Sequence, residues 1–165
     1  MSPSNDVEAL AEYSHPYLDS SVYVAVIQGE DGRVEDTRQI LRNAERNELR
    51  IVATTLVLAE VHKAGTADWT TDKIDRYFHR PHFLWVEVDY PLGVRARTLA
   101  REHRLRGADA IHLAGALRAG ADVFFTYDKR ILATSDVGIH VAEPFFRGQL
   151  SLSDEREQEP RQEPE

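Results

Sequence analysis

Four carboxylic acids stand in this chain where an apolar residue would be expected or where a strand should end. The clearest case is Asp19, which interrupts the apolar run 16-PYLDSSVYVAVIQ-28. Burying an unpaired carboxylate costs free energy, so such a group is normally paired, protonated or bound to a metal. The other three acids are Glu60, Asp109 and Asp128.

The local sequence indicates how the other three acids are placed. Glu60 lies on the apolar stripe of a predicted helix, three residues after Val57. Asp109 opens a predicted helix, and Asp128 ends a predicted strand. Because strand side chains alternate between faces, Thr126 and Asp128 are expected on the same side of the sheet.

A cluster of these four acids would have a defined chemistry. Carboxylates that share a site repel one another unless protons or cations compensate. Their hard oxygen ligands suit Mg²⁺ or Mn²⁺. Carboxylate-bound Mg²⁺ is a common device for displacement at phosphorus. The acids therefore predict a metal site for phosphodiester chemistry.

Each acid also has an ordinary structural interpretation. Asp109 could be a helix N-cap, which is the more common role of Asp at a helix start. Asp128 could be a turn residue, and Asp19 could be a cap or an Asx-turn. Glu60 could pair with a buried arginine. All four together, each at the same edge of one architecture, favour the metal site.

Alternating strand-like and helix-like stretches predict the architecture. Crossover connections between strands indicate an α/β fold with three α/β/α layers and a central, mainly parallel sheet. Sites in such sheets lie beyond the carboxyl ends of the strands, where the four acids are expected. The run 22–27 is β-branched, and by pattern alone it could continue the first strand. Other expected strands are 50–54, 83–88, 122–128 and 139–144, and expected helices are 34–47, 56–64, 74–79, 89–103, 109–120 and 129–133.

Composition bounds the class of protein. The chain has 165 residues, no cysteine and a formal net charge of −8. We expect a leader segment over 1–15, one domain over 16–150 and an acidic, disordered tail over 151–165. No stretch is apolar enough for a membrane span or a signal peptide, and the lack of cysteine fits a cytoplasmic location. The sequence contains neither a P-loop nor a Gly-x-Ser-x-Gly motif.

Four segments together resemble a known family. The stretches 17-YLDSSVYVAVI-27, 54-TTLVLAEV-61, 107-GADAIHLAGAL-117 and 121-ADVFFTYDKRI-131 are similar to the four motifs of PIN-domain ribonucleases, most of all to the VapC toxins of toxin–antitoxin systems. The resemblance covers roughly residues 16 to 144.

The resemblance implies fold, activity and partners. It implies that Asp19, Glu60, Asp109 and Asp128 bind Mg²⁺ or Mn²⁺, with Thr126 supporting the site. It also implies an endoribonuclease, usually a homodimer, held inactive by a cognate antitoxin. On this reading residues 22–27 form a helix after Asp19. The alternatives are a catalytically silent PIN-like module that binds RNA or protein, and a housekeeping nuclease that is not a toxin.

Basic residues beside the acids are candidates for substrate contacts. Arg106 precedes Asp109, and Lys129 and Arg130 follow Asp128, so any of them could contact an RNA phosphate. The ordinary interpretation is a solvated helix face. His112 stands three residues after Asp109, and we interpret it as a packing residue or a support for the site rather than a ligand.

Overall fold

The computed structural model describes residues 13–30, 32, 34–62 and 69–146. Most of the predicted leader and the whole tail 151–165 lie outside this part of the chain. The strands are β1 (Pro16–Leu18), β2 (Ile51–Thr54), β3 (Phe83–Val86), β4 (Val123–Phe125) and β5 (Val141–Ala142). The helices are α2 (Ser20–Gln28), α3 (Glu35–Glu45), α4 (Leu56–Val61), α5 (Thr71–Phe78), α6 (Tyr90–His103), α7 (Gly107–Arg118) and α8 (Lys129–Leu132).

The five strands form one sheet in the order β3-β2-β1-β4-β5. Every neighbouring pair is parallel, so the predicted mainly parallel sheet is confirmed. In the central strand, Tyr17 lies opposite Val52 of β2 and Phe124 of β4. All three side chains are fully buried, as expected for a parallel sheet covered on both faces.

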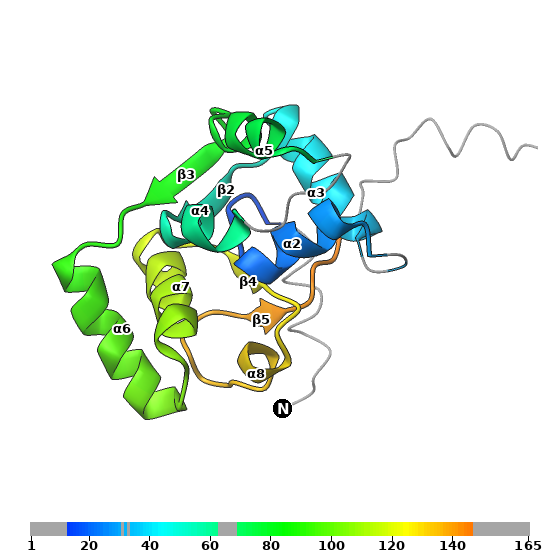
Figure 1. Ribbon diagram of the computed structural model, residues 1–165. Coiled ribbons are helices and arrows are strands. Elements are labelled where there is room, and N and C mark those ends of the chain that lie inside the picture. Colours follow the sequence, from blue (N-terminus) through cyan, green and yellow to red (C-terminus); the bar gives the residue numbers. More distant parts are fainter. Residues whose placement is uncertain (1–12, 31, 33, 63–68, 147–165) are drawn as a thin grey trace, which may run out of the picture.

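Alternation along the strands divides the core into two layers. Leu18 and Phe125 pack with residues of α2, α3, α4 and α5 on one face. Tyr17 and Phe124 pack with residues of α6, α7 and α8 on the other. Figure 1 shows the helices arranged around the sheet. The predicted three-layer α/β/α architecture is therefore confirmed.

The ambiguous run after Asp19 is a helix. α2 begins at Ser20 and ends where Gly29 adopts a left-handed conformation, with φ at 67°. Glycine takes this conformation without the steric cost that a side chain would add. The helix buries Val22, Tyr23 and Ile27 against the sheet. Burial of this face outweighs the strand preference of its β-branched residues.

Two predicted boundaries next to the acids are wrong. The helix expected to open at Asp109 begins at Gly107, so Asp109 lies in its first turn and is not an N-cap. The strand expected over 122–128 ends at Phe125. Thr126 and Asp128 therefore lie beyond the strand, and Asp128 is instead the N-cap of α8.

The last residues of the predicted leader are attached to the body. Backbone N–H groups of Ser14 and His15 donate to the Asp122 carboxylate, at 2.6 and 2.7 Å. The Tyr13 ring packs edge-on against Phe125, with 5.2 Å between ring centroids. Among the described helices, none is long and apolar enough to cross a membrane.

Candidate active site

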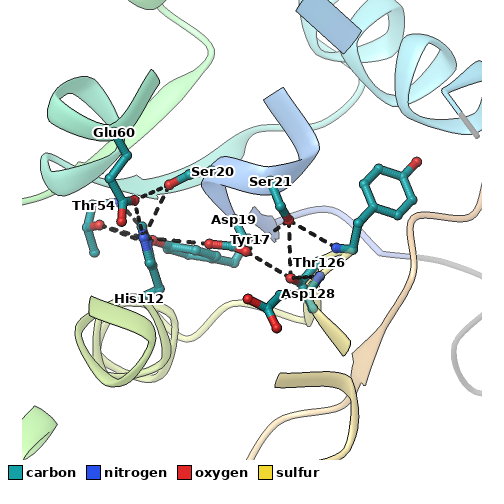
Figure 2. A network of polar contacts seen from close by, with 10 residues as sticks. Tyr17, Asp19, Ser20, Ser21, Thr54, Glu60, His112, Thr126 and Asp128 are labelled. Carbon is teal, nitrogen blue, oxygen red and sulfur yellow. Dashed lines mark hydrogen bonds and ion pairs between the residues drawn. The ribbon is translucent and has the colours of Figure 1, made fainter. Parts of the chain in front are cut away.

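The sequence-predicted acids gather around the carboxyl ends of β1 and β4. Asp19 follows β1, Asp128 follows β4, Asp109 comes from the first turn of α7, and Glu60 comes from α4. Figure 2 shows Asp19, Glu60 and Asp128 within one network of polar side chains. This is the edge of a parallel sheet where sites are expected.

Asp19 is held by two hydroxyl groups. Its side chain is only 7% exposed, and its Oδ2 accepts hydrogen bonds from Thr126 at 2.8 Å and Ser21 at 3.0 Å. Its Oδ1 lies 3.6 Å from Nε2 of His112. Although Asp19 is the residue before α2, its carboxylate does not cap the helix. These contacts orient the carboxylate toward the site instead of the helix end.

Thr126 connects two of the acids. Its fully buried hydroxyl donates to Asp19 and accepts from the backbone N–H of Asp128, at 3.0 Å. The carboxylate of Asp128 accepts from the backbone N–H of Arg130, at 2.8 Å. The chain between β4 and α8 is therefore fixed relative to the end of β1.

Glu60 pairs with His112. Glu60 Oε2 lies 2.6 Å from Nε2 of His112 and also accepts a hydrogen bond from Ser20. Partial burial alone would raise the pKa of Glu60, but the hydrogen bonds from His112 and Ser20 outweigh it and lower that pKa below its usual value. Because an ionised carboxylate only accepts hydrogen bonds, Nε2 of His112 carries a proton.

His112 is oriented from its other side by residues of two strands. Its Nδ1 lies 2.6 Å from the Tyr17 hydroxyl and 3.4 Å from Oγ1 of Thr54. The Tyr17 hydroxyl also lies 3.0 Å from Oγ1 of Thr54. His112 and Tyr17 are both almost completely buried. This chain of contacts fixes the imidazole, and through it the direction of Glu60.

Asp109 is the least satisfied of the acids. Its Oδ2 is buried and has no hydrogen-bond partner in the described part of the chain. Burial first, and then the negative charges of Asp128 and Asp19, raise the pKa of Asp109. His112 and Arg106 act in the opposite direction but do not overcome these effects. Three aspartates are thus close enough to repel one another.

The donor set of the site suits a divalent cation. A buried carboxylate oxygen without a hydrogen-bond donor, beside two further carboxylates, is stabilised by positive charge. In the described residues, no three acidic or histidine side chains are already grouped to hold a metal ion. Oδ2 of Asp19 is engaged by two hydroxyls, and Oε2 of Glu60 is engaged by His112 and Ser20. Coordination through these two oxygens would therefore require side-chain rotation.

The basic candidates lie at the rim. Arg106 immediately precedes α7 and acts electrostatically on Asp109. Lys129 and Arg130 form the exposed first turn of α8, directly after Asp128. All three are placed beside the acids, and no described residue forms an ion pair with any of them.

Sequence reasoning did not assign several residues of the network. Ser20, Ser21, Tyr17 and Thr54 all contact Asp19, Glu60 or His112. The serines directly after Asp19 were a usable signal, since a hydroxyl at a helix start can reach neighbouring carboxylates, as Ser21 reaches Asp19 and Ser20 reaches Glu60. The contacts of Tyr17 could not be predicted, because an aromatic residue in a buried strand is normally interpreted as part of the hydrophobic core.

Comparison with known proteins supports the same fold. The family profile described as the PIN domain matches residues 17–137. No curated protein sequence matches the chain significantly.

Several solved structures share the fold at low sequence identity. A toxin–antitoxin complex from Klebsiella pneumoniae is 17% identical, with a TM-score of 0.58, and covers 80% of this chain and 99% of its own. Mycobacterium tuberculosis VapC20, a sarcin-ricin loop cleaving toxin, is 16% identical, with a TM-score of 0.56 and coverages of 76% and 98%.

A third similar structure is VapBC2 from Rickettsia felis, bound to a DNA fragment from its promoter. It is 14% identical, has a TM-score of 0.56, and covers 78% of this chain and 98% of its own. The family profile extends from Tyr17, before Asp19, to Val137, beyond Asp128, and so includes all four acids. The chain belongs to the PIN domain family.

Proposed function

We propose that this protein is a metal-dependent endoribonuclease and the toxin of a toxin–antitoxin pair. The observation that carries the proposal is the convergence of Asp19, Asp109 and Asp128, in which a buried oxygen of Asp109 has no hydrogen-bond donor among the described residues. Such a site has an excess of negative charge that a divalent cation would balance.

Asp19, Asp109 and Asp128 would hold Mg²⁺ or Mn²⁺, with Glu60 as a further ligand or as a support for bound water. When bound, the ion would activate water and stabilise the charge that develops on the phosphate oxygens. Thr126 and Ser21 hold the Asp19 carboxylate in a fixed direction. His112 holds Glu60, which is ionised and so is able to accept a proton.

Arg106, Lys129 and Arg130 are the proposed RNA contacts. Their side chains are exposed and stand beside the acidic cluster, so they would attract phosphate to a site that otherwise repels it. Each is able to offset one backbone charge of an RNA strand.

The proposed partners are an antitoxin and a second copy of this chain. One similar structure is a toxin–antitoxin complex, and another is a toxin that cleaves the sarcin-ricin loop. For the homodimer, the support is the pair of exposed apolar side chains Tyr90 and Val94, which lie one turn apart on α6. An RNA substrate and a chain without cysteine fit activity in the cytoplasm.

The test is cleavage of RNA by the purified protein, with Mg²⁺ or Mn²⁺ and with a chelator. We expect cleavage that needs the ion and that falls by at least about 10²-fold in Asp19→Asn and in Asp109→Asn. Asp136→Asn is the matched control, because Asp136 is an exposed acid in a left-handed conformation that asparagine also tolerates. Undiminished cleavage by both site variants would rule out the assigned site.

The toxin role has its own test. Expression of the protein alone should arrest growth of the host, and expression of the product of an adjacent small gene should restore growth. Growth arrest that persists in Asp19→Asn would show that toxicity does not come from this site. Cleavage without growth arrest would identify a nuclease that is not a toxin.

A further inference from the structure

A groove of about 600 Å³ lies between α2, α3 and α5. None of the residues that line it belongs to the polar network of Figure 2. It is therefore a second concave surface, separate from the acids.

The groove is basic on a protein that is acidic as a whole. The chain carries a net charge of −8, yet five cationic side chains and only one carboxylate, that of Glu45, line this surface. Glu35 partly neutralises two of the cations by ion pairs from outside the groove. In the described part of the chain, Arg76 and Arg80 form no ion pair. The five cationic residues are Arg38, Arg42, Lys73, Arg76 and Arg80.

The groove also exposes apolar surface. Leu41, Trp69 and Tyr77 line it and are only partly buried. Lys73 Nζ lies 4.6 Å from the centroid of the Trp69 ring, so cationic and aromatic surfaces are adjacent. Together these features suit a ligand that carries negative charge next to apolar side chains.

The C-terminal segment of this chain has that chemistry. Residues 147–165, which lie outside the described part, contain Leu150 and Leu152 followed by a sequence with six acids and two arginines. The two leucines match the apolar surface of the groove, and the acids after them match its arginines.

The described chain ends within reach of the groove. Phe145 packs against Tyr13 and Phe125, and Phe145 and Phe146 contact the same core cluster as Leu41 and Tyr77. The segment that follows could span roughly 60 Å if it were extended. A tethered segment of this kind is present at an effective concentration of about 1 mM.

We propose that the acidic C-terminal segment 150–165 binds in the groove between α2, α3 and α5. Leu150 and Leu152 contact the surface formed by Leu41, Trp69 and Tyr77, and the acids that follow pair with Arg76 and Arg80. The segment thereby competes with any other anionic ligand for this groove. The proposal does not depend on nuclease activity.

The absence of cysteine allows a direct test on the full chain. Ser153→Cys creates a single site for a bimane label, whose fluorescence is quenched by contact with tryptophan. Only Trp69 of the two tryptophans lines the groove. If the segment binds with a dissociation constant of about 1 mM, it is bound roughly half of the time, and emission is expected to fall by up to about twofold.

Three results are expected. Trp69→Phe should restore the emission, because it removes the quencher. Arg76→Glu with Arg80→Glu should restore it by repelling the acids, and so should salt at about 1 M, where the Debye length is only about 3 Å. Arg95→Glu with Arg97→Glu on α6 is the matched control and should leave the quenching unchanged, since these arginines are exposed but do not line the groove.

Other outcomes would overturn the proposal. Emission equal to that of the Trp69→Phe variant would show that the segment does not reach the groove. Quenching that depends on protein concentration would assign the groove to the segment of a second copy. An RNA oligonucleotide that binds at Arg76 and Arg80 without changing the emission would assign the groove to RNA instead.

Discussion

At the scale of single residues, the burial of the Asp19 carboxylate is explained by its immediate neighbours. This carboxylate is buried, but two hydroxyl groups donate to it and an imidazole nitrogen lies 3.6 Å away. Its charge is therefore solvated by the protein. Asp109 is in the opposite situation, since its buried oxygen has no donor among the described residues and its neighbours are acids. The electrostatic repulsion within the cluster therefore acts mainly on Asp109.

We therefore predict that Asp109→Asn stabilises the protein when divalent ions are absent. The pKa of Asp109 is raised in the folded state, so its protonated form is the one that favours folding. This contribution to the free energy of unfolding is fully present below the usual pKa of 3.8 and is lost as pH rises through the raised value. Removing the charge should raise the free energy of unfolding at pH 7 by about 1 kcal/mol or less, because solvent screens a group that is only partly buried.

Urea unfolding of Asp109→Asn and wild type at pH 7 with a chelator measures this difference. Asp122→Asn is the control with the opposite sign. Burial alone would raise the pKa of Asp122, but hydrogen bonds from the N–H groups of His15 and Ser14 outweigh it and lower that pKa. Its ionised form therefore stabilises the fold at neutral pH. An Asp109→Asn variant less stable than wild type would contradict the proposed repulsion.

Tyr17 is a second residue that has contacts within the candidate site. Its hydroxyl contacts His112 and Thr54 in a fully buried position. Tyr17→Phe leaves these partners short of a hydrogen bond and is expected to cost about 1–3 kcal/mol of stability. Because His112 holds Glu60, RNA cleavage should also fall.

The matched variant is Tyr13→Phe. The Tyr13 hydroxyl donates to the backbone oxygen of Phe145 at 2.6 Å and has no contact with the acids. It should lose stability to a similar extent while cleavage at a temperature well below unfolding stays unchanged. Equal effects of the two variants on cleavage would show that the Tyr17 hydroxyl serves stability alone.

At the scale of elements, sequence patterns predicted the order of strands and helices well but placed several ends wrongly. The buried runs at β2 and β3 were recognisable because they are short, apolar and β-branched or aromatic. The helix at 22–27 was not separable from a strand by periodicity, since its residues are almost continuously apolar and six of the nine residues of α2 are buried. Only the resemblance to PIN domains resolved it.

The contacts within the site could not be predicted for a different reason. The pattern placed four acids at one edge, but it did not indicate that Glu60 pairs with His112, because that contact depends on how α4 and α7 pack. Equally, the end of β4 at Phe125 depends on where β5 stops pairing with it. Tertiary packing, not local propensity, decides both features.

The packing of α7 against β2 leads to a prediction about Gly115. A Cβ added at Gly115 would collide with the side chain of Thr54, which belongs to the His112 network. Gly115→Ala is therefore expected to destabilise the protein by about 1–3 kcal/mol and to reduce cleavage. Thermal unfolding and RNA cleavage measure the two effects.

Gly93→Ala is the matched control within α6. Apart from the local backbone of α6 and the neighbouring residues, no atom lies within 4 Å of a Cβ at Gly93, so the alanine gains up to about 1 kcal/mol from helix propensity alone. The two substitutions should thus shift the unfolding temperature in opposite directions. A Gly115→Ala variant as stable as wild type would show that α7 is able to move away from β2.

At the scale of the whole molecule, an exposed apolar surface predicts self-association. Tyr90 is 85% exposed, and Val88 and Val94 beside it are also exposed. Apolar side chains clustered in this way commonly mark an interface. Tyr90→Asp with Val94→Asp should convert a dimer to a monomer in light scattering at micromolar concentration. A wild-type protein that is already monomeric under these conditions would contradict the homodimer.

The proposed metal site predicts that Mg²⁺ or Mn²⁺ stabilises the whole protein by binding its folded state. An ion at 100 times its dissociation constant adds about 2.7 kcal/mol, which for a domain of this size raises the unfolding temperature by several degrees. The rise should increase with the logarithm of ion concentration. It should disappear in Asp19→Asn, because that substitution removes a charged ligand without changing the shape of the side chain.

Asp136→Asn, at an exposed acid, is the control and should keep the full rise in unfolding temperature. A rise of equal size in Asp19→Asn would place the ion elsewhere. An unfolding temperature of the wild type that does not change on chelation would mean that the acids hold no ion and are kept apart by hydrogen bonds alone.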